Sequence, residues 1–173
     1  GFLERQKYYS IGWNHIVGYG YYGYTNFLDI KRPHDRFEQL NIQIKPNHIN
    51  PEGFILICGQ VPWDTQLQSV NYKEWLTTLV RDIKKHTTRR IVFRPHPKQN
   101  PQNARAIMDL PGTEKSQNAT LEEDFKGAFA VLAYNSNSVL EAMISGLPIF
   151  CFDRGSVVYD VANHDIAQIE RPS

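Results

Sequence analysis

The pattern of hydrophobic and polar positions along the chain changes near residue 50. From there on, apolar residues gather in short, nearly continuous runs, set between longer segments that mix apolar and charged positions. Runs of this length and apolarity are typical of β-strands buried on both faces. The pattern predicts four strands, at residues 54–58, 90–93, 128–133 and 148–152.

Between these runs, apolar positions recur with the spacing of an amphipathic helix. After the first strand, five apolar residues fall on one helical face: Trp75, Leu76, Leu79, Val80 and Ile83. A second helix is predicted after Pro101 from the spacing of Ala104, Ile107 and Met108, with Pro111-Gly112 as its stop.

Capping boxes, in which a hydroxyl residue is followed three positions later by glutamate, predict two further helices. The first box, Thr120–Glu123, opens a short helix that we expect to end near Lys126. The second box, Ser138–Glu141, opens a helix that Gly146 and Pro148 end in the expected order. Its predicted inner face consists of Val139, Leu140, Met143 and Ile144.

Strands and helices that alternate in this way form a parallel sheet with helices on both faces. Right-handed crossovers then give an α/β fold of the Rossmann-like, doubly wound class. We expect this domain to occupy residues 51–173, because the turn-rich stretch 46–53 is the best internal boundary. Residues 1–50 are expected to form an aromatic, glycine-rich segment, either a linker or the remnant of an acceptor-side domain.

Glycine and tyrosine nearly alternate at residues 18–24, with Tyr8, Tyr9 and Trp13 just before them. Such a stretch has little helical or strand periodicity and many permissive backbone positions. It favours an ordered loop packed by its own aromatic rings. A surface that stacks on a sugar or a nucleobase is the alternative.

The overall charge gives no footprint of a polyanion partner, because 19 Lys and Arg residues nearly balance 18 Asp and Glu residues. A local basic cluster at 84–90 is typical of a solvated helix end, where cations complement the helix dipole. No apolar run is long enough to cross a bilayer, and no signal-peptide pattern is present. We expect a cytoplasmic protein, with peripheral attachment to the inner membrane left open.

The two cysteines, Cys58 and Cys151, both lie inside predicted strands. Their apolar surroundings predict buried thiols in neighbouring strands, and argue against a disulfide framework or a metal site.

Three polar segments follow predicted strands and should meet at the carboxyl edge of the sheet, where such folds bind ligands. They are Gly59-Gln60, Arg94–Pro97 and Tyr134–Ser138. Within the third, Asn135, Ser136, Asn137 and Ser138 join a buried strand to a helix N-terminus. Free N–H groups there favour an anion, while a purely structural cap at Ser138 is the simpler alternative.

The segment Arg94-Pro-His-Pro97 places a histidine between two prolines, which hold the backbone extended on both sides. A rigidly held His96 beside the guanidinium of Arg94 suits recognition of a phosphate, since arginine binds such oxygens in a bidentate way. No second ligand lies at a suitable spacing from His96, so a metal site is not expected. Glu141 could reach the ribose hydroxyls of a nucleotide, or serve only as half of the capping box.

The motifs Arg94–Pro97 and Asn135–Ser138, followed by Glu141, Gly146 and Pro148, resemble the bacterial capsule-polysaccharide glycosyltransferases. This family includes Kdo transferases and polysialyltransferases, with relatives among the teichoic-acid polymerases. The resemblance implies the donor-binding domain of a two-domain (GT-B) glycosyltransferase. By the same resemblance, His96, Pro97, Ser136 and Ser138 bind the phosphate and nucleotide of a sugar donor, often a CMP-activated one, with Glu141 as a further candidate.

The resemblance covers residues 54–153 and extends only loosely to residues 1–50. In this family an amino-terminal domain usually supplies the acceptor site and the catalytic base. Here a missing domain, a partner chain or residues 1–50 would have to complete the cleft. Candidate bases in that segment are Glu4, His15, Asp29 and Asp35, and nothing in the sequence selects among them.

The predicted function is transfer of a sugar from a nucleotide-sugar to a hydroxyl of a polysaccharide or another acceptor. No Asp-x-Asp metal motif is present, so neither a metal nor another cofactor is expected. Three alternatives stay open. They are a viral-type DNA-modifying glycosyltransferase, a non-catalytic nucleotide- or sugar-binding module, and an epimerase of similar shape.

Overall fold

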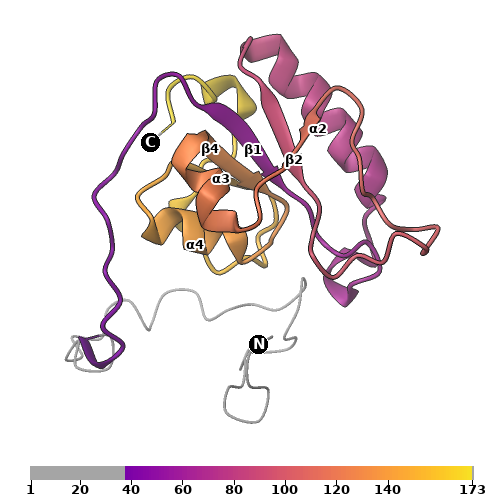
Figure 1. The fold of residues 1–173 in the computed structure, drawn as a ribbon, viewed down its shortest axis with the longest axis horizontal. Coiled ribbons are helices and arrows are strands. Elements are labelled where there is room, and N and C mark those ends of the chain that lie inside the picture. Colours follow the sequence, from indigo (N-terminus) through magenta and orange to yellow (C-terminus); the bar gives the residue numbers. More distant parts are fainter. Residues whose placement is uncertain (1–37, 173) are drawn as a thin grey trace.

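Five parallel strands form a single sheet in the computed structural model, which describes residues 38–172. The sheet order is β3-β2-β1-β4-β5. Figure 1 labels the central strands β2, β1 and β4. All four strand pairs are parallel. The strands are β1 (Phe54–Cys58), β2 (Ile91–Arg94), β3 (Glu114–Lys115), β4 (Ala128–Ala133) and β5 (Ile149–Cys151).

Helices cover both faces of this sheet. The long helix α2 (Tyr72–His86) lies on one face, and the short helices α3 (Leu121–Gly127) and α4 (Ser138–Ile144) lie on the other (Figure 1). Three 3-10 turns complete the described elements: η1 (Thr65–Leu67), η2 (Tyr159–Val161) and η3 (Ile166–Gln168). The predicted fold class is confirmed: this is a Rossmann-like α/β domain with a doubly wound parallel sheet.

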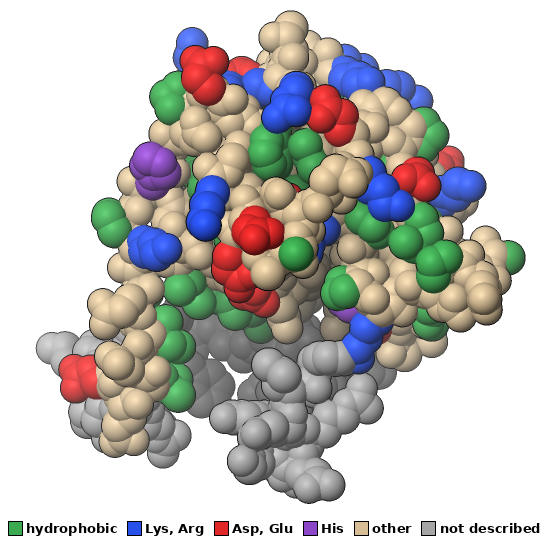
Figure 2. All heavy atoms as spheres, viewed as in Figure 1, with side chains coloured by type: hydrophobic (Ala, Val, Ile, Leu, Met, Phe, Trp, Pro, Cys, Tyr) green, Lys and Arg blue, Asp and Glu red, His purple; other side chains and the backbone are tan. Residues whose placement is uncertain are grey.

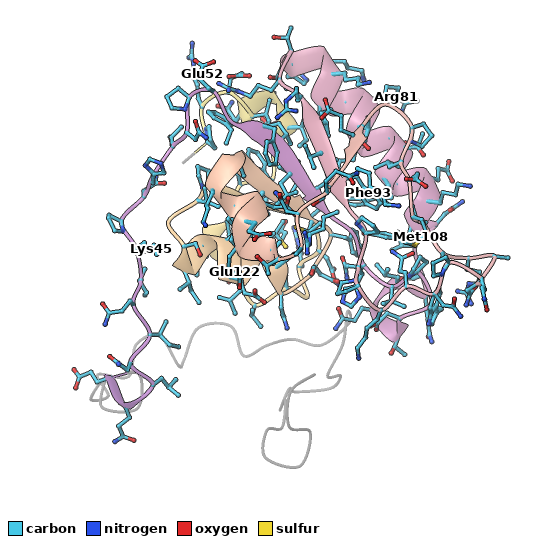
Figure 3. All side chains as sticks on the ribbon, in the orientation of Figure 1. Lys45, Glu52, Arg81, Phe93, Met108 and Glu122 are labelled. Carbon is cyan, nitrogen blue, oxygen red and sulfur yellow. The ribbon has the colours of Figure 1, made fainter. Side chains whose placement is uncertain are left out.

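The core has two layers because successive side chains of a strand point to opposite faces. In β1, Ile55 and Ile57 pack on the α2 side, whereas Leu56 and Cys58 pack on the side of α3 and α4. Figure 3 shows Phe93 of β2 between the sheet and α2. Burial on both faces explains why these strands are nearly continuous apolar runs.

The helix predicted after Pro101 is wrong: residues 101–105 form turns, and residues 106–110 belong to no regular element. The side chains of Asn100 and Asn103 accept hydrogen bonds from backbone N–H groups two residues ahead. The backbone N–H of Ile107 donates to the side chain of Gln99 at 2.5 Å. These side chains take backbone groups that a helix would need, and such competition disfavours helix formation.

One of the two predicted capping boxes is confirmed. Thr120 and Glu123 make both reciprocal hydrogen bonds at the start of α3. The box predicted at Ser138 is wrong, because Ser138 is already the first residue of α4 and the cap residue, Asn137, makes no side-chain hydrogen bond. The hydroxyl of Ser138 donates to Ser136 Oγ instead, at 3.0 Å.

An extended segment precedes the sheet, and we call residues 42–50 the arm. Its backbone joins the end of α4, where Lys45 N–H donates to Ile144 O at 2.9 Å and His48 N–H donates to Gly146 O at 2.6 Å. The residues of the arm before Lys45 extend away from the sheet and its helices (Figure 1). The tyrosine-rich stretch 18–24 and the four candidate bases lie outside the described residues, so the predicted boundary at residue 50 stays a prediction.

The predicted burial of both cysteines is confirmed, and both are free thiols. Their predicted placement in neighbouring strands is wrong, because β4 lies between β1 and β5. The chain returns from β3 to pair β4 with β1, a step that local sequence does not reveal.

The basic cluster at the end of α2 is largely engaged in ion pairs. Arg89 contacts Glu170 at 3.1 Å, and Lys85 contacts Asp82 at 2.6 Å. Lys and Arg side chains are spread over the visible face and not gathered in one patch (Figure 2). This distribution agrees with the balanced overall charge. No helix between residues 38 and 172 has the length and apolarity needed to cross a bilayer.

Candidate functional site

The order of the strands reverses at β1, and this reversal locates the candidate site. The chain runs outward from β1 to β2 and β3, and then returns to place β4 on the other side of β1. In open α/β sheets ligands bind in the crevice at such a reversal, outside the carboxyl ends of the strands. Because all strands are parallel, the predicted segments 59–60, 94–97 and 134–138 reach the same edge of the sheet.

Gln60 and Asn135 bridge this crevice directly. The backbone N–H of Asn135 donates to Gln60 Oε1 at 3.0 Å, and Gln60 Nε2 donates to Asn135 Oδ1. Gln60 is 6% exposed and Asn135 8% exposed, so these hydrogen bonds join two buried side chains. The backbone N–H of Gln60 is also satisfied, by the hydroxyl of Tyr72 at 3.0 Å. These two predicted site residues thus set the geometry of the crevice.

The same network contains two residues that sequence reasoning missed, Gln99 and Asp153. Gln99 Nε2 donates to Gln60 O at 3.2 Å, which ties the loop after β2 to the loop after β1. Asn135 Nδ2 donates to Asp153 Oδ2 at 2.6 Å, which ties in the loop after β5. Asp153 directly follows a predicted strand, and this position could have identified it as a candidate site residue. For Gln99 the sequence offers no comparable signal.

Arg94 is held by a buried carboxylate. Its Nη1 contacts Asp124 Oδ2 at 2.6 Å, and the two side chains are 17% and 1% exposed. Nη1 also donates to Ser116 Oγ at 3.2 Å, and Nη2 donates to the backbone oxygen of Ala119 at 3.0 Å. This geometry favours a structural role in which Arg94 ties β2 to α3. Asp124 lies 30 positions away in sequence, so no local pattern links the pair.

His96 lies half-buried in the loop after β2. Burial lowers the pKa of its imidazole, and the nearby Lys98 lowers it further. Its Nδ1 accepts a hydrogen bond from the backbone N–H of Lys98 at 3.1 Å. The ring is therefore neutral near pH 7, with its proton on Nε2, where it can donate to a ligand oxygen. The adjacent Pro97 is exposed.

The turn between β4 and α4 offers hydrogen-bond donors. Ser136 Oγ accepts from the backbone N–H of Ser138 at 3.3 Å, which shapes the turn. Within residues 38–172, no acceptor is found for the backbone N–H groups of Ser136 and Asn137. Successive N–H groups in a turn form an anion-binding concavity. Ser138 also contacts the thiol of Cys58, whose burial raises its pKa to about 12, so this cysteine is an uncharged packing group.

Glu141 lies exposed on α4, one turn after the site. Partial burial raises the pKa of its carboxyl group, and the nearby Glu122 of α3 raises it further. Figure 2 shows acidic side chains gathered over α3, and Figure 3 labels Glu122 there. The predicted role of Glu141 as half of a capping box is excluded by the cap geometry of α4. The proposed contact with ribose stays a prediction.

An aromatic cluster borders the crevice on the α2 side. The ring of Trp75 lies 5.1 Å from that of Tyr134, edge to face, and 5.6 Å from that of Phe152. Tyr72 stacks on Trp75 at 5.7 Å. Tyr134 and Phe152 directly follow β4 and β5, and both are only partly buried. Apolar rings beside a few convergent polar groups are typical of small-molecule sites.

Among residues 38–172, no group of three or more His, Cys, Asp or Glu side chains lies together in a way that could hold a metal ion. The expectation that neither a metal nor a cofactor is needed stays a prediction.

Comparison with known proteins finds likeness among solved structures. No model of a known protein family matches the chain, and no curated protein matches it significantly in sequence. Among solved structures, the chain is similar to KpsC of Thermosulfurimonas dismutans, a beta Kdo 2,7 transferase, at 19% identity and a TM-score of 0.51. The match covers 81% of this chain and 52% of that one, so the chain spans about half the length of this relative. The likeness shows a shared Rossmann-like α/β fold.

Proposed function

We propose that this chain is the nucleotide-sugar-binding part of a glycosyltransferase. The observation that carries the proposal is the reversal of strand order at β1, at the edge of the sheet that the loops of Gln60, His96 and Ser136 share because all strands are parallel. The fold that the chain shares with a Kdo transferase supports the same reading.

The phosphate of the donor would contact the turn after β4. The backbone N–H groups of Ser136 and Asn137 and the hydroxyl of Ser136 supply donors, and the Nε2–H of neutral His96 supplies another. Ser138 orders this turn, because its own hydroxyl donates to Ser136 Oγ. Pro97 fixes the backbone beside His96. Gln60 and Asn135 hold the loops at the right separation, and Glu141 is kept as a candidate for the ribose. Arg94 acts in this scheme through Asp124 and not on the ligand.

The reaction would be substitution at the anomeric carbon of the sugar. An acceptor hydroxyl forms a new C–O bond and gives its proton to a base, while the bond from the sugar to the nucleotide phosphate breaks. The leaving phosphate keeps the electron pair of that bond, and the donors of the turn after β4 stabilise its charge. The base and the acceptor site would come from outside residues 51–172, since the chain spans about half the length of the related transferase. The proposed acceptor is a glycan or another hydroxyl compound.

Calorimetric titration with CMP, UDP, GDP and ADP tests the donor site. We expect one nucleotide to bind the wild type, and His96→Ala and Ser136→Ala each to weaken it by about tenfold or more, the equivalent of one lost hydrogen bond to a charged group. Matched controls are His86→Ala, at the end of α2 that lies away from the candidate site, and Ser69→Ala, on an exposed turn. Both controls should bind as the wild type does.

Two results would contradict the proposal: absence of binding by any nucleotide to the folded protein, or equal losses in the site variants and their controls. Incubation of a nucleotide-sugar with glycan acceptors then separates transfer from a non-catalytic binding module. Product formed only when acceptor is present supports transfer, and retained binding without product supports the module.

A further inference from the structure

A directed chain of hydrogen bonds runs through the candidate site and ends on Asp153. The backbone N–H of Ile107 donates to Gln99 Oε1, and Gln99 Nε2 donates to Gln60 O. Gln60 Nε2 donates to Asn135 Oδ1, and Asn135 Nδ2 donates to Asp153 Oδ2. The side-chain amides of Gln60 and Asn135 both donate in the direction of the carboxylate.

The direction of the chain follows from groups that can play only one role. The backbone N–H of Asn135 can only donate, so the oxygen of the Gln60 amide must face it. The nitrogen of Gln60 then faces the Asn135 side chain, which must present its oxygen in return. The nitrogen of Asn135 is left to face Asp153, which must accept. The network therefore requires an acceptor at position 153, and an ionised carboxylate is the strongest acceptor available there.

The carboxylate of Asp153 is also held rigidly. Its backbone N–H donates to Tyr134 O at 3.0 Å, and its backbone oxygen accepts from the N–H of Ser156 at 3.0 Å. Its Oδ2 is occupied by Asn135. Between residues 38 and 172, no group donates a hydrogen bond to Oδ1. One carboxylate oxygen is thus positioned at the carboxyl edge of the sheet with no donor among the described residues.

An anionic acceptor at this place selects the part of a ligand that donates hydrogen bonds. It repels phosphate, for which the N–H donors lie in the turn that begins at Ser136. It accepts hydrogen bonds from hydroxyl groups. The partly buried rings of Phe152 and Tyr134 directly precede Asp153 and Asn135 and give the site an apolar wall. A ring that carries hydroxyl groups next to a phosphate matches this arrangement.

We propose that Asp153 determines specificity by accepting a hydrogen bond from a hydroxyl group of the ligand, supplied by either the ribose or the transferred sugar of a nucleotide-sugar. Gln60, Asn135 and Gln99 are positioning residues for this carboxylate. The proposal rests on the proposed donor site, and it adds the residue that binds a hydroxyl group of the carbohydrate.

Titration of wild type and Asp153→Asn tests it with four probes: the ribonucleotide that binds, its 2′-deoxy form, its 3′-deoxy form, and the corresponding nucleotide-sugar. The substitution keeps an oxygen for Asn135 and replaces the outer acceptor with a donor. We expect a loss of about tenfold to a hundredfold, the range for a hydrogen bond to a charged group. Asp82→Asn on α2, far from the carboxyl edge, is the matched control and should bind as the wild type does.

The pattern of losses identifies the source of the hydroxyl. If the variant weakens the ribonucleotide and no longer distinguishes a deoxy form, the hydroxyl belongs to the ribose. If only the nucleotide-sugar is weakened, the hydroxyl belongs to the sugar. Equal binding of every probe by wild type and variant overturns the proposal and leaves the donor site standing, provided that His96→Ala still loses binding. No binding to the wild type overturns both.

A second variant covers the case in which Asp153→Asn does not fold. Asp153→Glu keeps the charge and an acceptor but moves the carboxylate by one methylene, so it should show the same selective loss. Unchanged affinity for all four probes in Asp153→Glu, together with an unchanged melting temperature, would also overturn the proposal.

Discussion

Perturbing the ion pair between Arg94 and Asp124 tests whether Arg94 stabilises the fold or binds phosphate. Asp124 is 1% exposed and also accepts hydrogen bonds from Ser116 and Asn118, each at 2.8 Å. Arg94→Met removes the cation and keeps most of the packing volume, which leaves a buried carboxylate without its charge partner. We expect the nucleotide affinity per folded molecule to change little, because Arg94 acts on the fold.

The size of the loss of stability follows from burial. Breaking a buried pair by removing one partner lowers the free energy of unfolding by about 3–5 kcal/mol. The two remaining donors to Asp124 place the expectation at the lower end, about 3 kcal/mol. For a chain of this size that corresponds to a fall in Tm of about 6–12 °C. Asp124→Asn should cost less, about 1–2 kcal/mol, because Arg94 is 17% exposed and keeps its carbonyl partners.

Urea denaturation of the wild type, both single variants and the double variant measures this pair as a double-mutant cycle. A coupling energy above about 1 kcal/mol supports the structural role. Lys85→Met, which removes an exposed ion pair with Asp82, is the matched control and should change stability by less than about 1 kcal/mol. The reasoning is refuted if Arg94→Met leaves the Tm unchanged and abolishes nucleotide binding.

Three further predictions concern the backbone, the thiols and the histidine. Gly146→Ala should lower stability by about 2 kcal/mol or more, because φ is +81° and a Cβ would lie 2.2 Å from a backbone oxygen of the arm. Gly112→Ala, with φ +83°, should cost less, because its Cβ would meet the flexible end of Lys84 and lie in ordinary contact with Val80 at 3.4 Å; thermal melts compare the two variants. Cys58 and Cys151 should resist iodoacetamide at pH 8 until the protein is denatured, as mass spectrometry would show, since burial raises both pKa values. For His96 the folded pKa lies below the unfolded one, so its contribution to stability is complete above about pH 6.5 and is lost as pH falls through the folded pKa. Urea midpoints of His96→Gln should therefore fall less steeply than those of the wild type from pH 7 to 5; an equal slope would contradict this.

The strands and the main helix could be predicted because their signals are local. The strands at Phe54–Cys58 and Ala128–Ala133 have the predicted bounds, since a strand buried on both faces must be apolar throughout. The capping box at Thr120–Glu123 was equally readable, because both of its hydrogen bonds lie within four residues. The helix expected after Pro101 failed for the opposite reason: its backbone donors are taken by side chains, one of them eight positions away.

The candidate site was predicted only in outline. Parallel strands place the segments after β1, β2 and β4 at one edge, and the alternation of strands and helices in the sequence was enough to infer this. The sequence could not say which side chains face a ligand and which face one another. Arg94 contacts Asp124, which lies 30 positions away in sequence, and Gln60 contacts Asn135, which lies 75 positions away.

The sequence by itself determined the fold class and the edge at which chemistry can occur, because hydrophobic periodicity and capping act over a few residues. Only the tertiary structure decided the strand order, the partner of Arg94 and the place of Asp153 at the end of the amide chain. Each of these depends on how the chain returns from β3 to lay β4 beside β1. Buried polar groups must find partners wherever the fold brings them, and that choice is made in space and not along the sequence.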